Sequence, residues 1–484
     1  MTRDLEMILH DHDRPVWHYL PAEGLLWDPC AAIKWQGRYH VFFLHSSWAQ
    51  AGPPRRSDGY VYKAWAHISS SDLVNWERHP NALKRGQTGG LFVFRGTPTL
   101  IFPHPDGGGA SCIASNPEGD LMAWRFDPRH PVLRHPVQGE GLYPRSNDVT
   151  AWQEGDWCYA LTGTRDISGA GDALYLFRSR DLQGWEYVDR FFQSQRRWTD
   201  AGDDCSCPQL FELGDRWMLL HFCHRRPQDQ VRPLGSRFYL GHYREQRFEA
   251  EAFGAINWPG GNFHAPRCLL DEDGRRILFA NLHEGRSQAA CERSGWSGVL
   301  SMPVVISLAP GGAALHYEPA AELESLRREP RELRDLLVEA DGELELPEIA
   351  GDSLELDVEF GRTDAEEFGL VLRRSPDGSE QTRVSFTREA AAVRIDFSRS
   401  GRRADLDYLQ GRTLQEAPFR FDPGTGPRLR VFLDRSVLEL FAGRQRFLAQ
   451  RIYPGPEATG VRLFSRGGAT AVARLRAWRL GRAS

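Results

Sequence analysis

Lysine is nearly absent from this chain, and so is any strong excess of charge of one sign. Only three of the 60 basic residues are lysines (Lys34, Lys63 and Lys84), and the 65 acidic residues leave a net charge of -5. So mild a balance argues against nucleic acid or an anionic membrane surface as a partner. The arginine bias follows no spatial pattern in the sequence, and we attribute it to genomic composition.

Long apolar runs are also missing. The sequence contains no stretch of about 18 apolar residues, and residues 1–6 are polar, without the apolar core of an export signal. Cysteines are few, because eight are spread over a chain of 484 residues. That distribution favours reduced thiols over a disulfide framework. We therefore expect a soluble, cytoplasmic protein that does not span a membrane.

The composition changes near residue 300. Of the 15 tryptophans, 14 lie between Trp17 and Trp296, and all eight cysteines precede residue 292. After that point, segments such as 353–360 and 429–434 alternate apolar and polar residues between Asp and Gly turns, which is typical of an antiparallel β-sandwich. We predict one domain over 1–308, a linker over 309–345 rich in Glu, Arg and Leu, and a sandwich over 346–484 with a supporting role.

The first domain contains a repeat. A glycine followed by a β-branched or aromatic strand recurs at intervals of 59, 59, 59 and 60 residues, at Gly37, Gly96, Gly155, Gly214 and Gly274. A second signal, Asp-Leu-x-x-Trp, follows three of these copies and ends at Trp76, Trp124 and Trp185. Repeated units of about four strands are the signature of β-propeller blades. The sequence therefore predicts an all-β fold, a five-bladed β-propeller followed by the β-sandwich.

A propeller directs the search for functional residues to the innermost strand of each blade, just before the hairpin glycine. Seven to ten residues upstream of the five glycines lie Asp28, Thr88, Asp148, Ser206 and His264. Asp28 and Asp148 fall at equivalent positions of blades one and three, so they should face each other across the axis. Two carboxyl groups across a sugar-sized space are the equipment of glycoside hydrolysis.

Several motifs carry a resemblance to glycoside hydrolase family 32, the invertase, levanase and inulinase family. Trp27-Asp28-Pro29 and the strand after it resemble the family's Asn-Asp-Pro-Asn-Gly motif, and Trp65-Ala-His67 resembles its Trp-Gly-His. Asn262-Phe-His-Ala-Pro266 and the segment 429–454 are similar to the family's last blade and C-terminal sandwich. The resemblance covers nearly the whole chain and implies β-fructofuranosidase chemistry on a small-molecule or oligosaccharide substrate, without a cofactor or metal.

The resemblance also implies roles for the two carboxylates. Asp28 would be the nucleophile that attacks the anomeric carbon, in a retaining mechanism that hydrolyses the bond or transfers the sugar. Asp148, in the stretch Asn147-Asp148-Val149, matches the Asp of the family's Arg-Asp-Pro motif and would stabilise the transition state.

The third family motif is altered. The family's Glu-Cys-Pro carries the general acid/base, and here Ser206 stands in place of that Glu. A serine hydroxyl cannot protonate an alkoxide leaving group at neutral pH. Asp204, two residues earlier on the same face of a regular strand, is the first candidate for a displaced acid. His45, His221 and His264 are alternatives, because an imidazolium can act as an acid near neutral pH.

Other positions of these motifs differ as well, so specificity for a different furanoside is open. The residues expected to bind substrate are Trp27, His45, Trp65, Thr88, Asn147, Ser206 and His264. Cys205, Cys207, His221, Cys223 and His224 have the residue types of a zinc site but not its spacing, and buried strand cysteines explain them better.

Three functions stay open at this point. The chain is a retaining glycosidase with a displaced acid, a catalytically silent sugar-binding protein, or a propeller glycosidase of different sugar specificity that uses a histidine acid.

Overall fold

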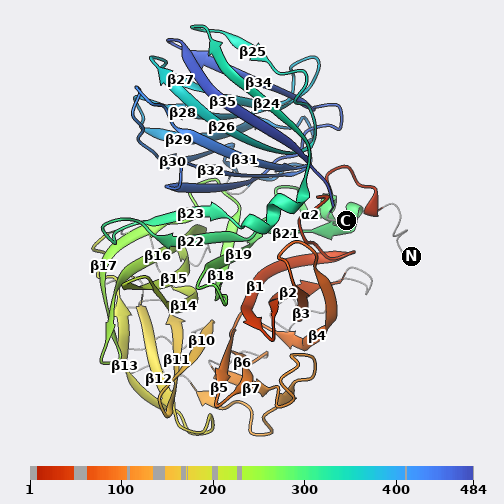
Figure 1. Cartoon of the computed structure of the whole chain (residues 1–484). Coiled ribbons are helices and arrows are strands. Elements are labelled where there is room, and N and C mark those ends of the chain that lie inside the picture. Colours follow the sequence, from red (N-terminus) through yellow and green to blue (C-terminus); the bar gives the residue numbers. More distant parts are fainter. Residues whose placement is uncertain are drawn as a thin grey trace.

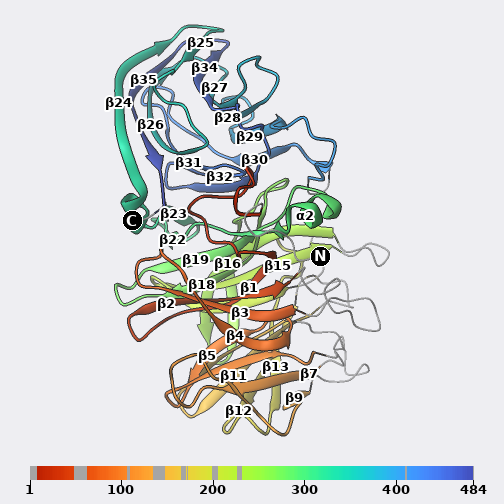
Figure 2. The same ribbon diagram turned by 90° about the vertical axis from the view of Figure 1, so that its right-hand side faces the viewer.

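The structure, a computed structural model, describes residues 8–47, 63–105, 110–134, 148–164, 171, 173–198, 205–225, 232–408 and 411–482. It is built almost wholly of strands, in two bodies (Figure 1). Residues up to 319 form five sheets arranged around an axis, and the remainder forms two stacked sheets at one end of the molecule (Figures 1 and 2). No helix in the described ranges is long and apolar enough to cross a membrane.

Each of the five sheets is an antiparallel blade whose strands pair mainly in chain order. Blade one consists of β1 (Gly24–Trp35), β2 (Arg38–Ser46), β3 (Lys63–Ser70) and β4 (Glu77–Gly86). Blade two consists of β5 (Gly90–Phe94), β6 (Thr97–Pro103), β7 (Ala110–Ser115), β8 (Arg125–Phe126) and β9 (Leu133–Arg134). Blade three consists of β10 (Val149–Glu154), β11 (Trp157–Thr164), β12 (Ala173–Ser179) and β13 (Glu186–Gln193).

Blades four and five complete the circle. Blade four consists of β14 (Ser206–Leu213), β15 (Arg216–Arg225), β16 (Arg232–Arg244) and β17 (Arg247–Ala255). Blade five consists of β18 (Phe263–Leu270), β19 (Arg276–Leu282), β21 (Val299–Leu300), β22 (Val304–Leu308) and β23 (Leu315–Pro319). Between β19 and β21, the helix α2 (Gln288–Ser294) leads to β20 (Trp296–Ser297), which pairs in parallel with β1. This pairing ties the last blade to the first.

The first strands of the blades surround the axis. β1 contacts β5 and β18, β5 contacts β10, β10 contacts β14, and β14 contacts β18, so the five strands form a closed ring. The predicted five-bladed propeller is therefore confirmed.

The repeated glycines occupy the turn between the first and second strands of every blade. Their φ values run from 58° to 80°, a left-handed conformation that costs glycine little. The second repeat is also a turn, between the third and fourth strands. In the three copies the Asp accepts backbone N–H bonds, and the following leucine (Leu73, Leu121 or Leu182) has a φ of 62° or 63°. Both periodic signals therefore encode turns.

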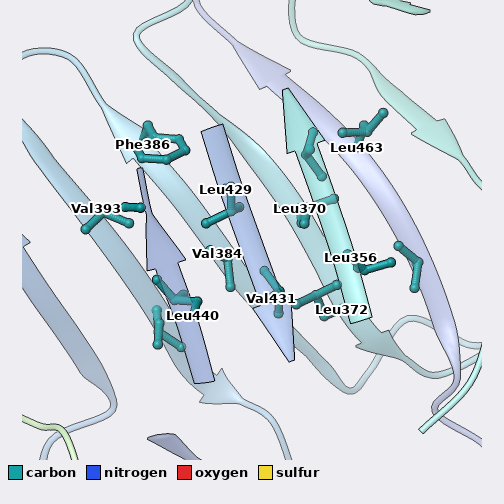
Figure 3. Packing of buried hydrophobic residues seen from close by; sticks show 14 of the residues in the cluster. Leu356, Leu370, Leu372, Val384, Phe386, Val393, Leu429, Val431, Leu440 and Leu463 are labelled. Carbon is teal, nitrogen blue, oxygen red and sulfur yellow. The ribbon is translucent and has the colours of Figure 1, made fainter. Parts of the chain in front are cut away.

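The C-terminal body is a sandwich of two six-stranded antiparallel sheets. One sheet has the order β24 (Arg327–Val338), β35 (Thr470–Leu480), β26 (Ser353–Thr363), β31 (Arg428–Asp434), β32 (Val437–Ala442) and β33 (Arg446–Arg451). The other has the order β25 (Glu343–Glu345), β34 (Gly460–Arg466), β27 (Glu367–Arg374), β28 (Gln381–Thr387), β29 (Ala392–Arg399) and β30 (Leu414–Pro418). Their facing apolar side chains form one core, part of which is drawn in Figure 3.

The segment 309–345, expected to be a linker, belongs instead to the two domains. β23 is the outer strand of blade five, and β24 and β25 are edge strands of the sandwich sheets, so only the short 3-10 helix Ala321–Leu326 joins the bodies. Of the 12 residues of β24, five are exposed Arg or Glu. Charged edge strands resist pairing with other chains, but they lack the apolar alternation by which a strand is recognised in a sequence.

The two bodies share a hydrophobic cluster. Phe432, Phe441 and Phe447 of the sandwich pack with residues of blades four and five, and the Phe263 and Phe447 rings lie 5.1 Å apart. A buried polar contact also joins them, because His18 lies between Asp434 (2.9 Å) and Glu439 (2.8 Å) of the sandwich.

Candidate active site

β-Bulges lie near the beginning of three inner strands. In β1 the register shifts between Leu26 and Pro29, so Trp27 and Asp28 together face one residue of β2. Equivalent shifts follow Ser206 in β14 and His264 in β18, and the residues next to them, Cys207 and Ala265, have φ near 50°. Bulges re-aim side chains and are common beside active sites. Here they set the direction of three side chains that the sequence singled out.

Asp28 and Asp148 lie close enough to act on each other electrostatically. The Asp28 carboxylate is 20% exposed, and Asp148 directly precedes β10. Burial raises the pKa of Asp148, and the charge of Asp28 adds to this effect. The backbone N–H of Cys207 (2.8 Å) and its thiol (3.5 Å) donate to Asp148 Oδ2 and oppose the rise. Two carboxylates from different blades thus interact electrostatically, in unlike environments.

A buried arginine lies beneath this pair. The guanidinium of Arg267 on β18 donates to the carbonyls of Cys207 (2.9 Å), Pro208 (3.1 Å) and Gly89 (2.8 Å), and so connects three blades. Its charge lowers the pKa of Asp148, although burial outweighs it. Arg267 therefore fixes the inner strands and supplies a permanent positive charge near the carboxylates.

Lys63 is a functional candidate that the sequence reasoning missed. It is the first residue of β3, only 8% exposed, and its Nζ lies 4.0 Å from the centroid of the Trp27 ring. Burial lowers the pKa of this ammonium, while Asp28, Cys30 and Asp148 act in the opposite direction. The rarity of lysine was the signal that could have found it, because only three of the 60 basic residues are lysines.

Two histidines adjoin Asp28. His264 Nε2 lies 3.5 Å from Asp28 Oδ1, and the His264 ring stacks on His283 at 3.9 Å with a 23° tilt. These three side chains offer ligand atoms within 4.8 Å of one another, which is the donor set of a two-histidine, one-carboxylate metal site. The separation of 3.5 Å between His264 Nε2 and Asp28 Oδ1 also allows His264 to orient the Asp28 carboxylate directly.

The remaining residues expected to bind substrate differ in position and in burial. Ser206 begins β14 next to Cys207, and Thr88, 5% exposed, lies two residues before β5, so both belong to the inner ends of the blades. The Trp65 side chain is fully buried, and its indole N–H donates to the carbonyl of Gln87 (2.9 Å), so it supports the segment that carries Thr88.

Two of the histidines have contacts away from the carboxylates. His45 Nε2 contacts the carbonyl of Glu23 (3.1 Å), and burial lowers its pKa. His221 is buried on β15, where its ring stacks on Tyr239. Asn147 and Asp204 lie outside the described residues.

Comparison with protein-family models matches the chain from end to end. The model of the glycosyl hydrolases family 32 N-terminal domain matches residues 18–319, and that of the glycosyl hydrolases family 32 C terminal matches residues 322–479. The gap between the two matches falls at the 3-10 helix that joins the propeller to the sandwich.

Curated proteins and solved structures agree with the family models. A sucrose-6-phosphate hydrolase of Klebsiella pneumoniae is 30% identical over 492 residues, covering 96% of this chain and 93% of that protein. A levanase of Bacillus sp. (strain L7) is 26% identical and covers 96% of this chain and 51% of that protein. The structure of fructan 1-exohydrolase IIa from Cichorium intybus superposes with a TM-score of 0.83 at 20% identity, covering 98% of each chain. The chain therefore belongs to glycoside hydrolase family 32.

Proposed function

We propose that this protein is a retaining glycoside hydrolase that cleaves β-fructofuranosides, either small molecules or oligosaccharides. The observation that carries the proposal is the electrostatic interaction between Asp28 and Asp148, which lie on the inner strand of blade one and just before that of blade three in a family 32 propeller. The names of similar proteins, sucrose-6-phosphate hydrolase and levanase, support a fructofuranosyl substrate.

The two carboxylates have separate tasks in this mechanism. Asp28, which is partly exposed, attacks the anomeric carbon while the bond from that carbon to the leaving oxygen breaks, which leaves a fructosyl ester on Asp28. Water then attacks the same carbon and releases the carboxylate. His264 lies close enough to orient the Asp28 carboxylate. Asp148, held by Cys207, accepts hydrogen bonds from sugar hydroxyls and stabilises the positive charge that develops on the ring.

The position of the proton donor distinguishes this chain from its family. Ser206 cannot replace a carboxyl group in that role, and the assignment of the acid to Asp204 stays a prediction. Losing general acid catalysis typically costs about 10² to 10⁴-fold in rate. An aryl leaving group needs little protonation. Cleavage of an aryl substrate therefore depends on the nucleophile and only weakly on the acid.

The first experiment is incubation of the purified protein with sucrose, inulin, levan and an aryl β-fructofuranoside. We expect the aryl substrate to be cleaved, with activity lost in Asp28→Asn and kept in Asp156→Asn. Asp156 is a matched control because it is an exposed carboxylate in the hairpin turn of blade three. Equal activity of Asp28→Asn and the wild type would contradict the assignment of the nucleophile.

A second candidate function follows from Ser206, which stands where the proton donor is expected. If the donor were lost without replacement, the protein would be a sugar-binding protein that keeps the pair of carboxylates. Saturable binding of fructosides without release of product from any substrate, the aryl one included, would favour that function. The cytoplasmic location stays a prediction.

A further inference from the structure

We propose that Lys63 is the general acid/base of this site and performs the proton transfers for which Ser206 is unsuited. The inference rests on the proposed function and names the proton donor that the function requires. It would make Lys63 a catalytic residue of a reaction that other chains of the fold perform with a carboxylic acid.

The placement of Lys63 comes from two strands of blade one. Lys63 opens β3, and its register partner on β4 is Gly86. Its Nζ lies 4.0 Å from the ring centroid of Trp27, the residue that precedes the nucleophile. An ammonium over an indole face is held by the ring quadrupole. The lysine is thus held close to the residue that attacks the sugar.

The charged and titratable groups around Lys63 come from four elements. Asp28 and Cys30 face it from β1, Asp148 from the start of β10, and Cys207 from β14. Arg267 of β18 acts on Cys30, Asp148 and Cys207 in turn. The two carboxylates favour the charged ammonium, whereas burial lowers the pKa of Lys63 and brings the amine closer to neutral pH. A lowered pKa makes this ammonium a readier proton donor than an exposed lysine, which is the direction that an acid/base requires.

The choice of lysine is informative in this chain. Only three of its 60 basic residues are lysines, so a positive charge is ordinarily supplied by arginine. A guanidinium stays protonated at any relevant pH, whereas a buried ammonium can release its proton. If the residue only balanced the charge of the two carboxylates, an arginine would serve as well as a lysine.

The proton movements balance over the two halves of the reaction. As Asp28 bonds to the anomeric carbon, the glycosidic oxygen leaves with its electron pair and takes one proton from the Lys63 ammonium. The neutral amine then accepts a proton from the attacking water as the water oxygen bonds to the anomeric carbon and the Asp28 carboxylate departs. Lys63 and Asp28 both return to their initial states.

Among the described residues, the neighbouring titratable groups are less suited to this role than Lys63; Asp204, the candidate named from the sequence, lies outside those residues. His264 Nε2 lies 3.5 Å from Asp28 Oδ1, so its proton is directed at the nucleophile rather than at the leaving oxygen. Asp148 Oδ2 accepts from the backbone N–H and from the thiol of Cys207, so this oxygen is directed at Cys207 rather than at the leaving oxygen.

The test compares Lys63→Arg with the wild type on sucrose and on an aryl β-fructofuranoside. The variant keeps the positive charge and removes the transferable proton. We expect kcat/KM on sucrose to fall by about 10² to 10⁴-fold, with a far smaller change on the aryl substrate. Lys84→Arg is the matched control, because Lys84 is exposed on β4, and it should leave both activities unchanged.

A second measurement needs no variant. In the wild type, kcat/KM for sucrose should decline at alkaline pH as Lys63 deprotonates, whereas the aryl substrate should show a weaker decline. Equal losses on both substrates in Lys63→Arg, or no loss on sucrose, would overturn the assignment, as would parallel pH profiles in the wild type. A wild-type protein that cleaves neither substrate would refute the proposed function itself, and the role of Lys63 with it.

Discussion

At the scale of single residues, the site holds ionisable side chains in buried surroundings, which disfavour their charged forms. Asp148 is an acid whose pKa is raised by burial and by Asp28, against the hydrogen bonds from Cys207. Cys207 itself has a left-handed φ of 50°, a conformation that is unfavourable for a residue with a side chain. Groups held in such states cost stability and are typical of sites shaped by function.

We expect Asp148→Asn to separate activity from stability. The amide keeps an oxygen that can accept from Cys207 but carries no charge, so kcat should fall by about 10² to 10³-fold, as when an electrostatic stabiliser is removed. Because the net pKa shift of Asp148 is upward, its ionised form is disfavoured in the folded protein. The free energy of unfolding at neutral pH should therefore be equal or higher in the variant, as measured by denaturant unfolding. A stability loss together with full activity would contradict this account.

At the scale of elements, each blade depends on turns in left-handed conformations. Gly155 joins β10 to β11 with a φ of 58° and has no heavy atom within 4 Å of the position a Cβ would occupy. Gly184, in the Asp-Leu-x-x-Trp turn of the same blade, has an equally open surrounding but no left-handed φ. The two glycines therefore differ in backbone conformation rather than in available space.

We expect Gly155→Ala to destabilise the protein by about 1 kcal/mol, because an alanine is strained at positive φ. Gly184→Ala should be neutral or slightly stabilising, since alanine reduces the freedom of the unfolded chain. Denaturant unfolding of the two variants beside the wild type measures the difference. Equal effects of the two substitutions would show that the periodic glycines are not retained for their conformation.

At the scale of the whole molecule, the sandwich supports the propeller from one side. Glu284 of blade five, next to His283 in the site, accepts from Arg286 (2.8 Å) and from the hydroxyl of Tyr453 in the sandwich domain. Elsewhere in the interface, Asp434 accepts backbone N–H bonds from Val16, Trp17 and His18. The supporting role of the sandwich stays a prediction.

We expect the interface to make stability depend on pH through His18. Its hydrogen bonds to Asp434 and Glu439 outweigh the effect of burial and raise the pKa of His18 from 6.5 to about 9. A raised pKa in the folded state stabilises the protein below about pH 6.5, and this contribution disappears as the pH rises through about 9. The loss is on the order of 3 kcal/mol for a shift of this size.

Unfolding by denaturant at pH 6 and at pH 9.5 measures this effect. The decrease between the two pH values should be large in the wild type and in His12→Asn, whose histidine is exposed, and much smaller in His18→Asn. A decrease of the same size in His18→Asn would show that other groups account for it.

The sequence by itself determined the parts of this protein that are local and periodic. A glycine at a fixed interval specifies a turn wherever the chain folds, so five blades and the positions of Asp28 and Asp148 could be read from spacing. The charged edge strand β24 could not be recognised, because its residues make no apolar pattern. Only the tertiary structure decided which distant residues meet: Arg267 reaches Gly89 across 178 positions, and Lys63 and His283 join the two carboxylates from other strands. The physical reason is that closing the ring buries these groups together, and burial and neighbouring charge, which set their chemistry, are properties of the assembled fold.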